Sequence, residues 1–122
     1  MDFGTYIADL RDKKGLSLRE LEKKAGDLNH VYIWRLEKGD RDAPSPETLE
    51  KLFNALELSP REQELGRLLI RTEIHEELFQ IARDHTDIPM SDIEPVATMS
   101  FRGSRPTDQA GWLRLIEFVK DI

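Results

Sequence analysis

The stretch GLSLRELEKKAGDLNHVYIWRLEKG, residues 15–39, contains the start and end signals of two short helices. Its segment Ser17-Leu18-Arg19-Glu20 has the form of a capping box, because the serine hydroxyl can accept from a helical N–H while the glutamate reaches back. Gly26 tolerates the left-handed conformation that ends a helix. Asn29 is a favourable N-cap for the next helix, which we expect to end at Gly39. The stretch therefore predicts two helices that are joined by a tight turn and cross at a steep angle.

Further helices are expected on both sides of this stretch. A helix over about residues 5–14 precedes it, with an apolar stripe on one face. Downstream, a serine followed by a proline at 45–46 and again at 59–60 starts two more helices, since serine caps a helix and proline fits its first position. The second of these carries an apolar face to about Arg83. The sequence leaves open whether that helix is broken at Thr72.

The C-terminal part of the chain has a different character. Five proline and glycine residues punctuate residues 87–111, and no hydrophobic period persists there. We therefore expect a long loop or linker over this range. The segment from Trp112 to Ile122 is apolar enough to form a short terminal helix, because its large side chains are unfavourable in water.

The composition excludes several classes of protein. The 122 residues contain no cysteine, which removes disulfides and thiolate metal sites and suits a reducing compartment. No apolar run approaches the roughly 20 residues that a membrane helix needs. The N-terminal residues lack the basic and apolar regions of a signal peptide. We therefore expect a cytoplasmic protein that has no contact with a membrane.

The charge balance limits how the chain can bind a polyanion. The net charge is −6, and both halves are acidic: residues 1–58 carry 10 basic and 12 acidic side chains, and residues 59–122 carry 8 and 12. Phosphate contacts require lysine and arginine. Binding to nucleic acid would therefore have to come from a local basic face, with modest non-specific affinity.

We expect no enzymatic activity, no metal site and no cofactor. The three histidines, His30, His75 and His85, do not have metal-ligand spacing. His75-Glu76-Glu77 is like the start of a zinc-protease motif, but Phe79 stands where the second histidine is needed. The chain also lacks a glycine-rich phosphate-binding loop.

Four separated motifs resemble, in order and spacing, the XRE-type family of helix-turn-helix transcriptional regulators, which includes phage repressors and Cro-like proteins. They are GLSLREL at 15–21, AG at 25–26, YIWRLEKG at 32–39 and PSPETL at 44–49. The resemblance implies an all-α fold with a five-helix, repressor-like helix-turn-helix domain over residues 1–70. Residues 71–122 would then form a C-terminal helical extension with a loop and a short terminal helix, for dimerisation or partner binding.

The resemblance also implies that the helix from Asn29 to Leu36 is the recognition helix, which enters the major groove of double-stranded DNA. Ile33 and Leu36 are spaced to face the core, so the residues expected to face the bases are His30, Val31, Trp34 and Arg35. Phosphate contacts are expected from Ser17, Arg19, Asn29, Tyr32, Lys38 and Arg41. Two alternatives stay open: Arg35 as an ordinary solvated side chain, and Trp34 as an intramolecular or dimer contact.

The family likeness implies one structural ion pair, between Arg11 and Glu37. Such a partly buried pair would lock the first helix to the recognition helix, and removal of either partner would strand a charge. The chain also departs from the family pattern, since Glu22 occupies a position that is usually small. Further acids stand where DNA phosphates are expected to approach: Asp27, Asp40 and Asp42.

The function that follows is a sequence-specific transcriptional regulator, a repressor that binds a pseudo-palindromic operator as a homodimer, since dimers read two half-sites. The alternative is an antitoxin or a protease-controlled repressor whose tail binds a toxin or a protease. Its motivation is the loop-like segment 100–106, which contains an aromatic residue and two arginines. The residues expected to contact the second copy or another partner are Leu78, Phe101, Trp112, Ile116 and Phe118. The alternative for Phe101 and Trp112, that they fold back on the helical body, stays open.

Overall fold

The computed structural model describes residues 1–122 and contains eight α-helices and no strand. The capping box at Ser17 is confirmed, and so is the N-cap at Ser59, which also forms a capping box with Glu62. The helix that the sequence left open is broken after Arg71, so that two helices replace it. The eight helices are α1 (Phe3–Lys13), α2 (Leu18–Ala25), α3 (His30–Lys38), α4 (Pro46–Ala55), α5 (Pro60–Arg71), α6 (Glu76–Asp84), α7 (Met90–Ala97) and α8 (Gln109–Lys120).

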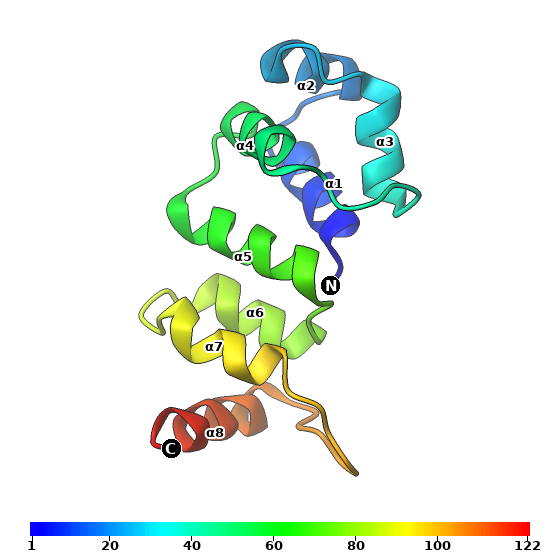
Figure 1. Cartoon of the computed structure of the whole chain (residues 1–122). Helices are drawn as coiled ribbons and strands as arrows, with labels where there is room; N and C mark the ends of the chain where they lie inside the picture. Colours follow the sequence, from blue (N-terminus) through cyan, green and yellow to red (C-terminus); the bar gives the residue numbers. More distant parts are fainter.

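The helices are stacked along one long direction (Figure 1). Helices α1 to α4 form one end, α5 lies in the middle, and α6 to α8 form the other end. Helix α3 packs against α1 and α2, whereas α8 packs against α6 and α7. The C-terminal helices therefore lie far from α3 and leave its outer face uncovered.

The expectation of a long irregular segment over residues 87–111 is wrong for residues 90–97 and for residues 109–111, where α8 begins. Residues 90–97 form α7, which buries Met90, Ile93 and Val96 against the rest of the molecule. Pro95 lies inside this helix and cannot donate the usual backbone hydrogen bond. Burial of the apolar stripe outweighs the missing bond, which local sequence pattern does not reveal. Residues 98–108 connect α7 to α8 without a further helix.

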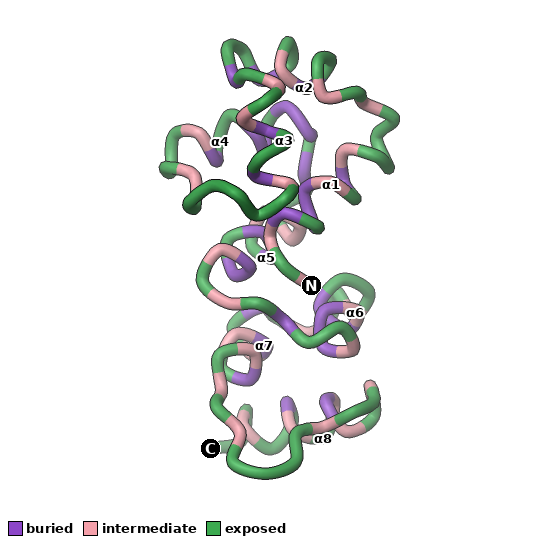
Figure 2. Tube along the Cα trace, turned by 90° about the vertical axis from the view of Figure 1, so that its right-hand side faces the viewer, coloured by how far each residue is buried: buried purple, intermediate pink, exposed green.

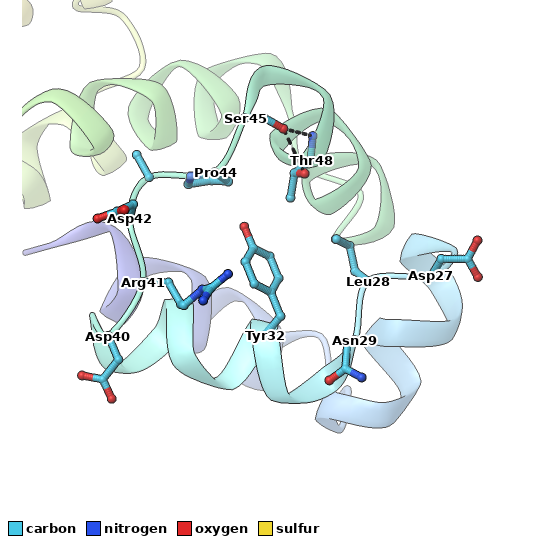
Figure 3. A pocket seen from close by; sticks show the side chains of 11 residues that line it. Asp27, Leu28, Asn29, Tyr32, Asp40, Arg41, Asp42, Pro44, Ser45 and Thr48 are labelled. Atoms are coloured by element: carbon cyan, nitrogen blue, oxygen red, sulfur yellow. Dashed lines mark hydrogen bonds between the residues drawn. The ribbon is translucent and has the colours of Figure 1, made fainter.

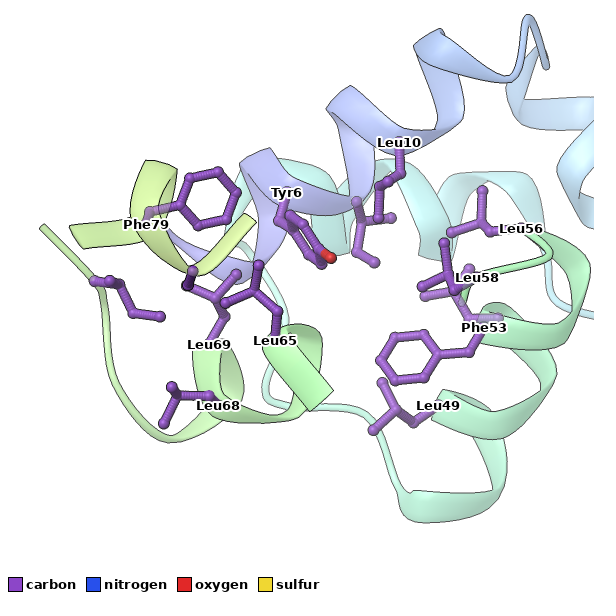
Figure 4. Close-up of a cluster of buried hydrophobic side chains, with 14 of the residues drawn as sticks. Tyr6, Leu10, Leu49, Phe53, Leu56, Leu58, Leu65, Leu68, Leu69 and Phe79 are labelled. Carbon is purple, nitrogen blue, oxygen red and sulfur yellow. The ribbon is translucent and has the colours of Figure 1, made fainter. Parts of the chain in front are cut away.

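One hydrophobic core runs through the whole stack (Figure 2). Figure 4 shows its central part, where Tyr6 of α1, Phe53 of α4, Leu65 of α5 and Phe79 of α6 meet. The Tyr6 and Phe79 rings pack edge to face, with their centroids 5.7 Å apart. The Tyr6 hydroxyl donates to the carbonyl of Glu62 at 2.9 Å, and burial raises the pKa of this phenol well above its usual range. The two ends of the molecule are thus packed together through side chains of α5 and α6.

Backbone and side-chain hydrogen bonds also join the N-terminal end to α6. Met1 and Ile74 exchange two of them, at 2.6 and 3.0 Å. The Arg61 guanidinium of α5 donates to three carbonyls at the end of α6 and in the loop after it, at distances between 2.5 and 3.1 Å: those of Ala82, His85 and Ile88. These contacts hold α6 on the helix-turn-helix half. None of the eight helices is long and apolar enough to cross a bilayer.

Gly4 of α1 lies very close to the end of α3. A methyl group built on Gly4 would lie 2.5 Å from the Leu36 carbonyl oxygen and 2.6 Å from that of Glu37. Both atoms belong to the backbone, so they cannot move away as the end of a flexible side chain would. Only glycine allows α1 and α3 to cross at this distance.

We therefore predict that Gly4→Ala destabilises the protein by about 1–3 kcal/mol, because the overpacking outweighs the higher helix propensity of alanine. Urea unfolding followed by circular dichroism measures this change. The control is Thr5→Ala, an exposed position on the same helix, which we expect to change stability by less than about 0.5 kcal/mol. Equal stability of Gly4→Ala and the wild type would contradict the close crossing.

Candidate nucleic-acid interface

The outer face of α3 is open to solvent along its length. Ile33 and Leu36 are buried, whereas Val31 and Trp34 are each 44% exposed. Arg35 is exposed and forms no ion pair within the chain. Trp34 forms no aromatic pair within the chain and is not part of the buried core. A large apolar side chain and a free arginine therefore project from the same short helix.

The N-terminus of α3 is held by two side chains. Asn29 is the N-cap, and its side-chain oxygen accepts from the backbone N–H of Val31 at 2.7 Å. Glu22 of α2 accepts from the backbone N–H of His30 at 2.6 Å and contacts the His30 Nδ1 atom at 2.9 Å. These hydrogen bonds hold the pKa of the Glu22 carboxyl below its usual range, because they stabilise the ionised form. Sequence reasoning missed this contact, since it joins residues across a turn.

The C-terminus of α3 is held by α1. Gly39 ends the helix in the left-handed conformation, with φ of 76°. The Arg11 guanidinium donates from Nε to Glu37 Oε2 at 2.6 Å and from Nη2 to Glu37 Oε1 at 2.9 Å, which is the two-point geometry of a strong pair. A third donor of Arg11 binds the Leu16 carbonyl at 2.9 Å. Glu37 raises the pKa of Arg11 further above its usual value, and its own side chain is 5% exposed.

A hollow of about 660 Å³ lies between α3, the loop after it and the start of α4 (Figure 3). The Tyr32 ring points into it from α3, and the Arg41 guanidinium lies 5.4 Å from the centre of that ring. At the far side, the Ser45 hydroxyl caps α4 by accepting from the Thr48 N–H. The carboxylates of Asp27 and Asp40 turn away from the hollow (Figure 3). Asp27, Asp40 and Asp42 all line this hollow, so Arg41 and the Tyr32 hydroxyl face an open space that acidic residues border.

The N-terminus of α2 already carries an anion. Glu20 accepts from the Ser17 backbone N–H at 3.1 Å, while the Ser17 hydroxyl accepts from the Glu20 N–H at 3.1 Å. The hydrogen bond from the Ser17 backbone N–H to the Glu20 carboxylate, with a smaller contribution from the Ser17 side chain, lowers the pKa of Glu20. A phosphate that approaches here can still accept the hydroxyl proton of Ser17 and meet the Arg19 side chain, which forms no ion pair within the chain.

The contact residues expected in the tail are mostly buried in the protein's own core. Leu78 and Trp112 are fully buried, and Ile116 is 2% exposed, so none of the three is a surface contact. Phe101 is half-buried and packs edge to face on Trp112, with centroids 5.8 Å apart. Phe118 alone of the five is exposed, at 66%. The sequence pattern did not reveal which of these apolar residues are buried, because Trp112 and Phe118 lie on different faces of one helix and only one face packs on the core.

Comparison with known families identifies the N-terminal part. Residues 7–63 match the family model described as Helix-turn-helix. The matched range extends from α1 into α5 and includes both helices of the crossing pair and the loop with Arg41. No curated protein sequence matches the chain.

The Arg11–Glu37 pair should carry much of the stability of this end of the molecule. We predict that Glu37→Ala destabilises the protein by about 3 kcal/mol, because it leaves a partly buried guanidinium without its carboxylate. A double-mutant cycle with Arg11→Ala, measured by urea unfolding, should give a coupling energy above about 0.5 kcal/mol. Lys51→Ala, which breaks the exposed Glu47–Lys51 pair, serves as control and should have little effect. Additive effects of Glu37→Ala and Arg11→Ala would contradict a stabilising interaction between these two side chains.

Proposed function

Residues 7–63 form an XRE-type helix-turn-helix domain, which makes the chain a DNA-binding transcriptional regulator, and we propose that it represses transcription by binding a pseudo-palindromic operator as a dimer. The observation that carries the proposal is the exposed outer face of α3, fixed at both ends and not covered by the C-terminal helices. This type of domain binds DNA and is not normally enzymatic.

In the proposed complex, α3 lies in the major groove and contacts the bases. Arg35 donates two hydrogen bonds to a guanine, the commonest specific contact in such complexes. Val31 packs on a thymine methyl group, and Trp34 covers further apolar edge. His30 lies at the start of the helix, where side chains of a recognition helix reach base edges. The exposure of Val31, Trp34 and Arg35, and the partial exposure of His30, support these roles.

The phosphate contacts are assigned to a local set of polar and basic groups around α3. Arg41 and Tyr32 face the hollow beside the helix, and Lys38 is exposed in its last turn. The set is completed at the start of α2 and at the N-terminus of α3, by Ser17, Arg19 and the side-chain amide of Asn29. Because the net charge of the chain is −6, these few groups must supply the attraction to DNA.

Two substitutions separate base contacts from phosphate contacts. Arg35→Ala should relax the sequence preference at one position and weaken specific binding by about 1–3 kcal/mol. Lys38→Ala should weaken binding evenly across sequences and reduce the slope of affinity against salt by about one. Fluorescence anisotropy with operator and scrambled DNA, at several salt concentrations, measures both. The two roles are wrongly assigned if both variants lose specific and non-specific binding equally.

The proposed dimer uses the outer face of α8. Trp112 and Ile116 anchor one face of this helix in the core, whereas Phe118 and, beyond the end of the helix, Ile122 are 66% and 89% exposed. Leu115 and Val119 add half-buried apolar surface beside them. A second copy that packs here would cover the most exposed large apolar side chains of the tail. Since α8 and α3 lie at opposite ends, the angle between the two subunits would set the spacing of the half-sites.

Light scattering tests this interface. The wild type should have the mass of a dimer at tens of micromolar, and Phe118→Glu should be a monomer, because it places a charge in the apolar contact. Glu117→Gln, an exposed neighbour on the same helix, should remain a dimer. A wild type that is strictly monomeric at this concentration, alone and on operator DNA, would overturn the dimer.

The alternative role as an antitoxin or protease-controlled repressor has less support. Its motivation was a loop-like segment followed by exposed aromatic residues. In the structure, Phe101 and Trp112 pack together, and Trp112 also stacks on the His75 ring at 5.4 Å. The segment thus folds back on the helical body, which leaves only the face around Phe118 for a partner. The motivation for this alternative is therefore weaker than the sequence pattern indicated.

A further inference from the structure

The contact between Glu22 and His30 bears on base recognition. We propose that Glu22 fixes the tautomer of His30, so that the first residue of α3 presents its Nε2 lone pair to an amino group of adenine or cytosine in the major groove. This inference rests on the proposed function, because it assumes that α3 contacts the bases. Glu22 would be a positioning residue, and His30 the residue that touches the base.

The tautomer follows from the hydrogen-bonding capacity of the two groups. An ionised carboxylate can only accept hydrogen bonds, so the 2.9 Å contact with Glu22 requires a hydrogen on His30 Nδ1. A neutral imidazole carries a single N–H, and its other nitrogen is an acceptor. The lowered pKa of Glu22 keeps this carboxyl ionised near neutral pH. The neutral His30 ring therefore has Nε2 as an acceptor.

The same carboxylate oxygen holds both the backbone and the ring of His30. Glu22 Oε1 accepts from the His30 backbone N–H at 2.6 Å as well as from the ring. The turn between the helices brings the two residues together, with positive φ at Gly26 (59°) and at Asp27 (71°). The buried side chain of Leu21 anchors α2 beside Glu22. The ring is thus held along its Nδ1 edge, and its side chain remains 28% exposed.

The location of the acceptor limits which bases it can meet. In the major groove, the amino groups of adenine and cytosine donate hydrogen bonds, whereas guanine N7 and O6 and thymine O4 accept them. A lone pair at the start of α3 is therefore complementary to the amino groups of adenine and cytosine. The negative charge of Glu22 also disfavours the acceptor edge of guanine, and Arg19 is the cation that lies near this carboxylate. The contacted strand should therefore carry adenine or cytosine at this position.

Nitrogen NMR of the free protein tests the tautomer without DNA. At pH 8, where imidazoles are neutral, His30 Nδ1 should show the shift of a protonated nitrogen and Nε2 that of an unprotonated one. Glu22→Gln keeps an oxygen for the backbone N–H of His30, but its amide can donate as well as accept, so the tautomer bias should fall. Glu50→Gln, an exposed glutamate on α4, is the control and should leave the His30 shifts unchanged. A wild type with hydrogen on Nε2 would refute the proposal.

Binding-site selection at pH 8 tests the base contact. His30→Ala identifies the position that the ring reads, as the one whose preference is lost. The wild type should prefer adenine or cytosine there by about three- to tenfold, and the selected sequence shows which of the two. Glu22→Gln should bring this preference below about twofold while the position read by Arg35 keeps its own.

Three outcomes overturn the inference: guanine or thymine at the His30 position, an unchanged preference in Glu22→Gln, or no position that depends on His30. If the wild type selects no sequence at all, the proposed function fails as well. The NMR result is independent of that failure, so the two can be told apart. Thermal melting of Glu22→Gln shows that a change in preference is not caused by loss of the fold.

Discussion

Helix α3 has nine residues, and an isolated helix of this length is marginal in water, so its place depends on what holds its two ends. At the C-terminal end, the absent side chain of Gly4 lets α1 reach the carbonyls of Leu36 and Glu37, and Arg11 binds the Glu37 carboxylate at two points. At the N-terminal end, Asn29 and Glu22 take up free backbone N–H groups. Because both ends of α3 are held in this way, the side chains on its outer face are not needed to keep the helix in place.

The C-terminal helices contribute to the same constraint from a distance. Helix α1 holds α3 only as firmly as α1 itself is held, and its inner face rests on α5 and α6 through Tyr6. Arg61 in turn ties the end of α6 to α5 by three hydrogen bonds. One core therefore runs from α3 to α8, which argues against two mechanically independent halves. A change at the tail can reach α3 only through these packed elements.

The parts of the structure that local rules control were predictable. Serine caps, glycine stops and the inward spacing of Ile33 and Leu36 depend on neighbours within one turn, so the first four helices and the start of the fifth follow from the sequence. Among the pairings across the fold, the family resemblance implied only the Arg11–Glu37 pair. The close approach at Gly4 and the Glu22–His30 contact could not be predicted without coordinates. Helix α7 was missed because Pro95 and a short apolar stripe contradict each other locally. Trp112 was predicted to contact a partner but is buried, because the spacing of apolar residues along a helix does not show which face packs on the core.

Because the chain is acidic, its binding to DNA would depend more on hydrogen bonds to the bases than on general attraction to phosphates. A protein that binds DNA mainly through charge gains affinity for every sequence alike, since phosphates carry no sequence information. Here acids occupy the start of α2 and contact the first residue of α3, and both lower the general attraction to DNA. The balance between specific and non-specific sites depends on the ratio of the two affinities, not on either alone. Carboxylates close to the groove therefore favour discrimination, provided that the side chains between them are held in one orientation.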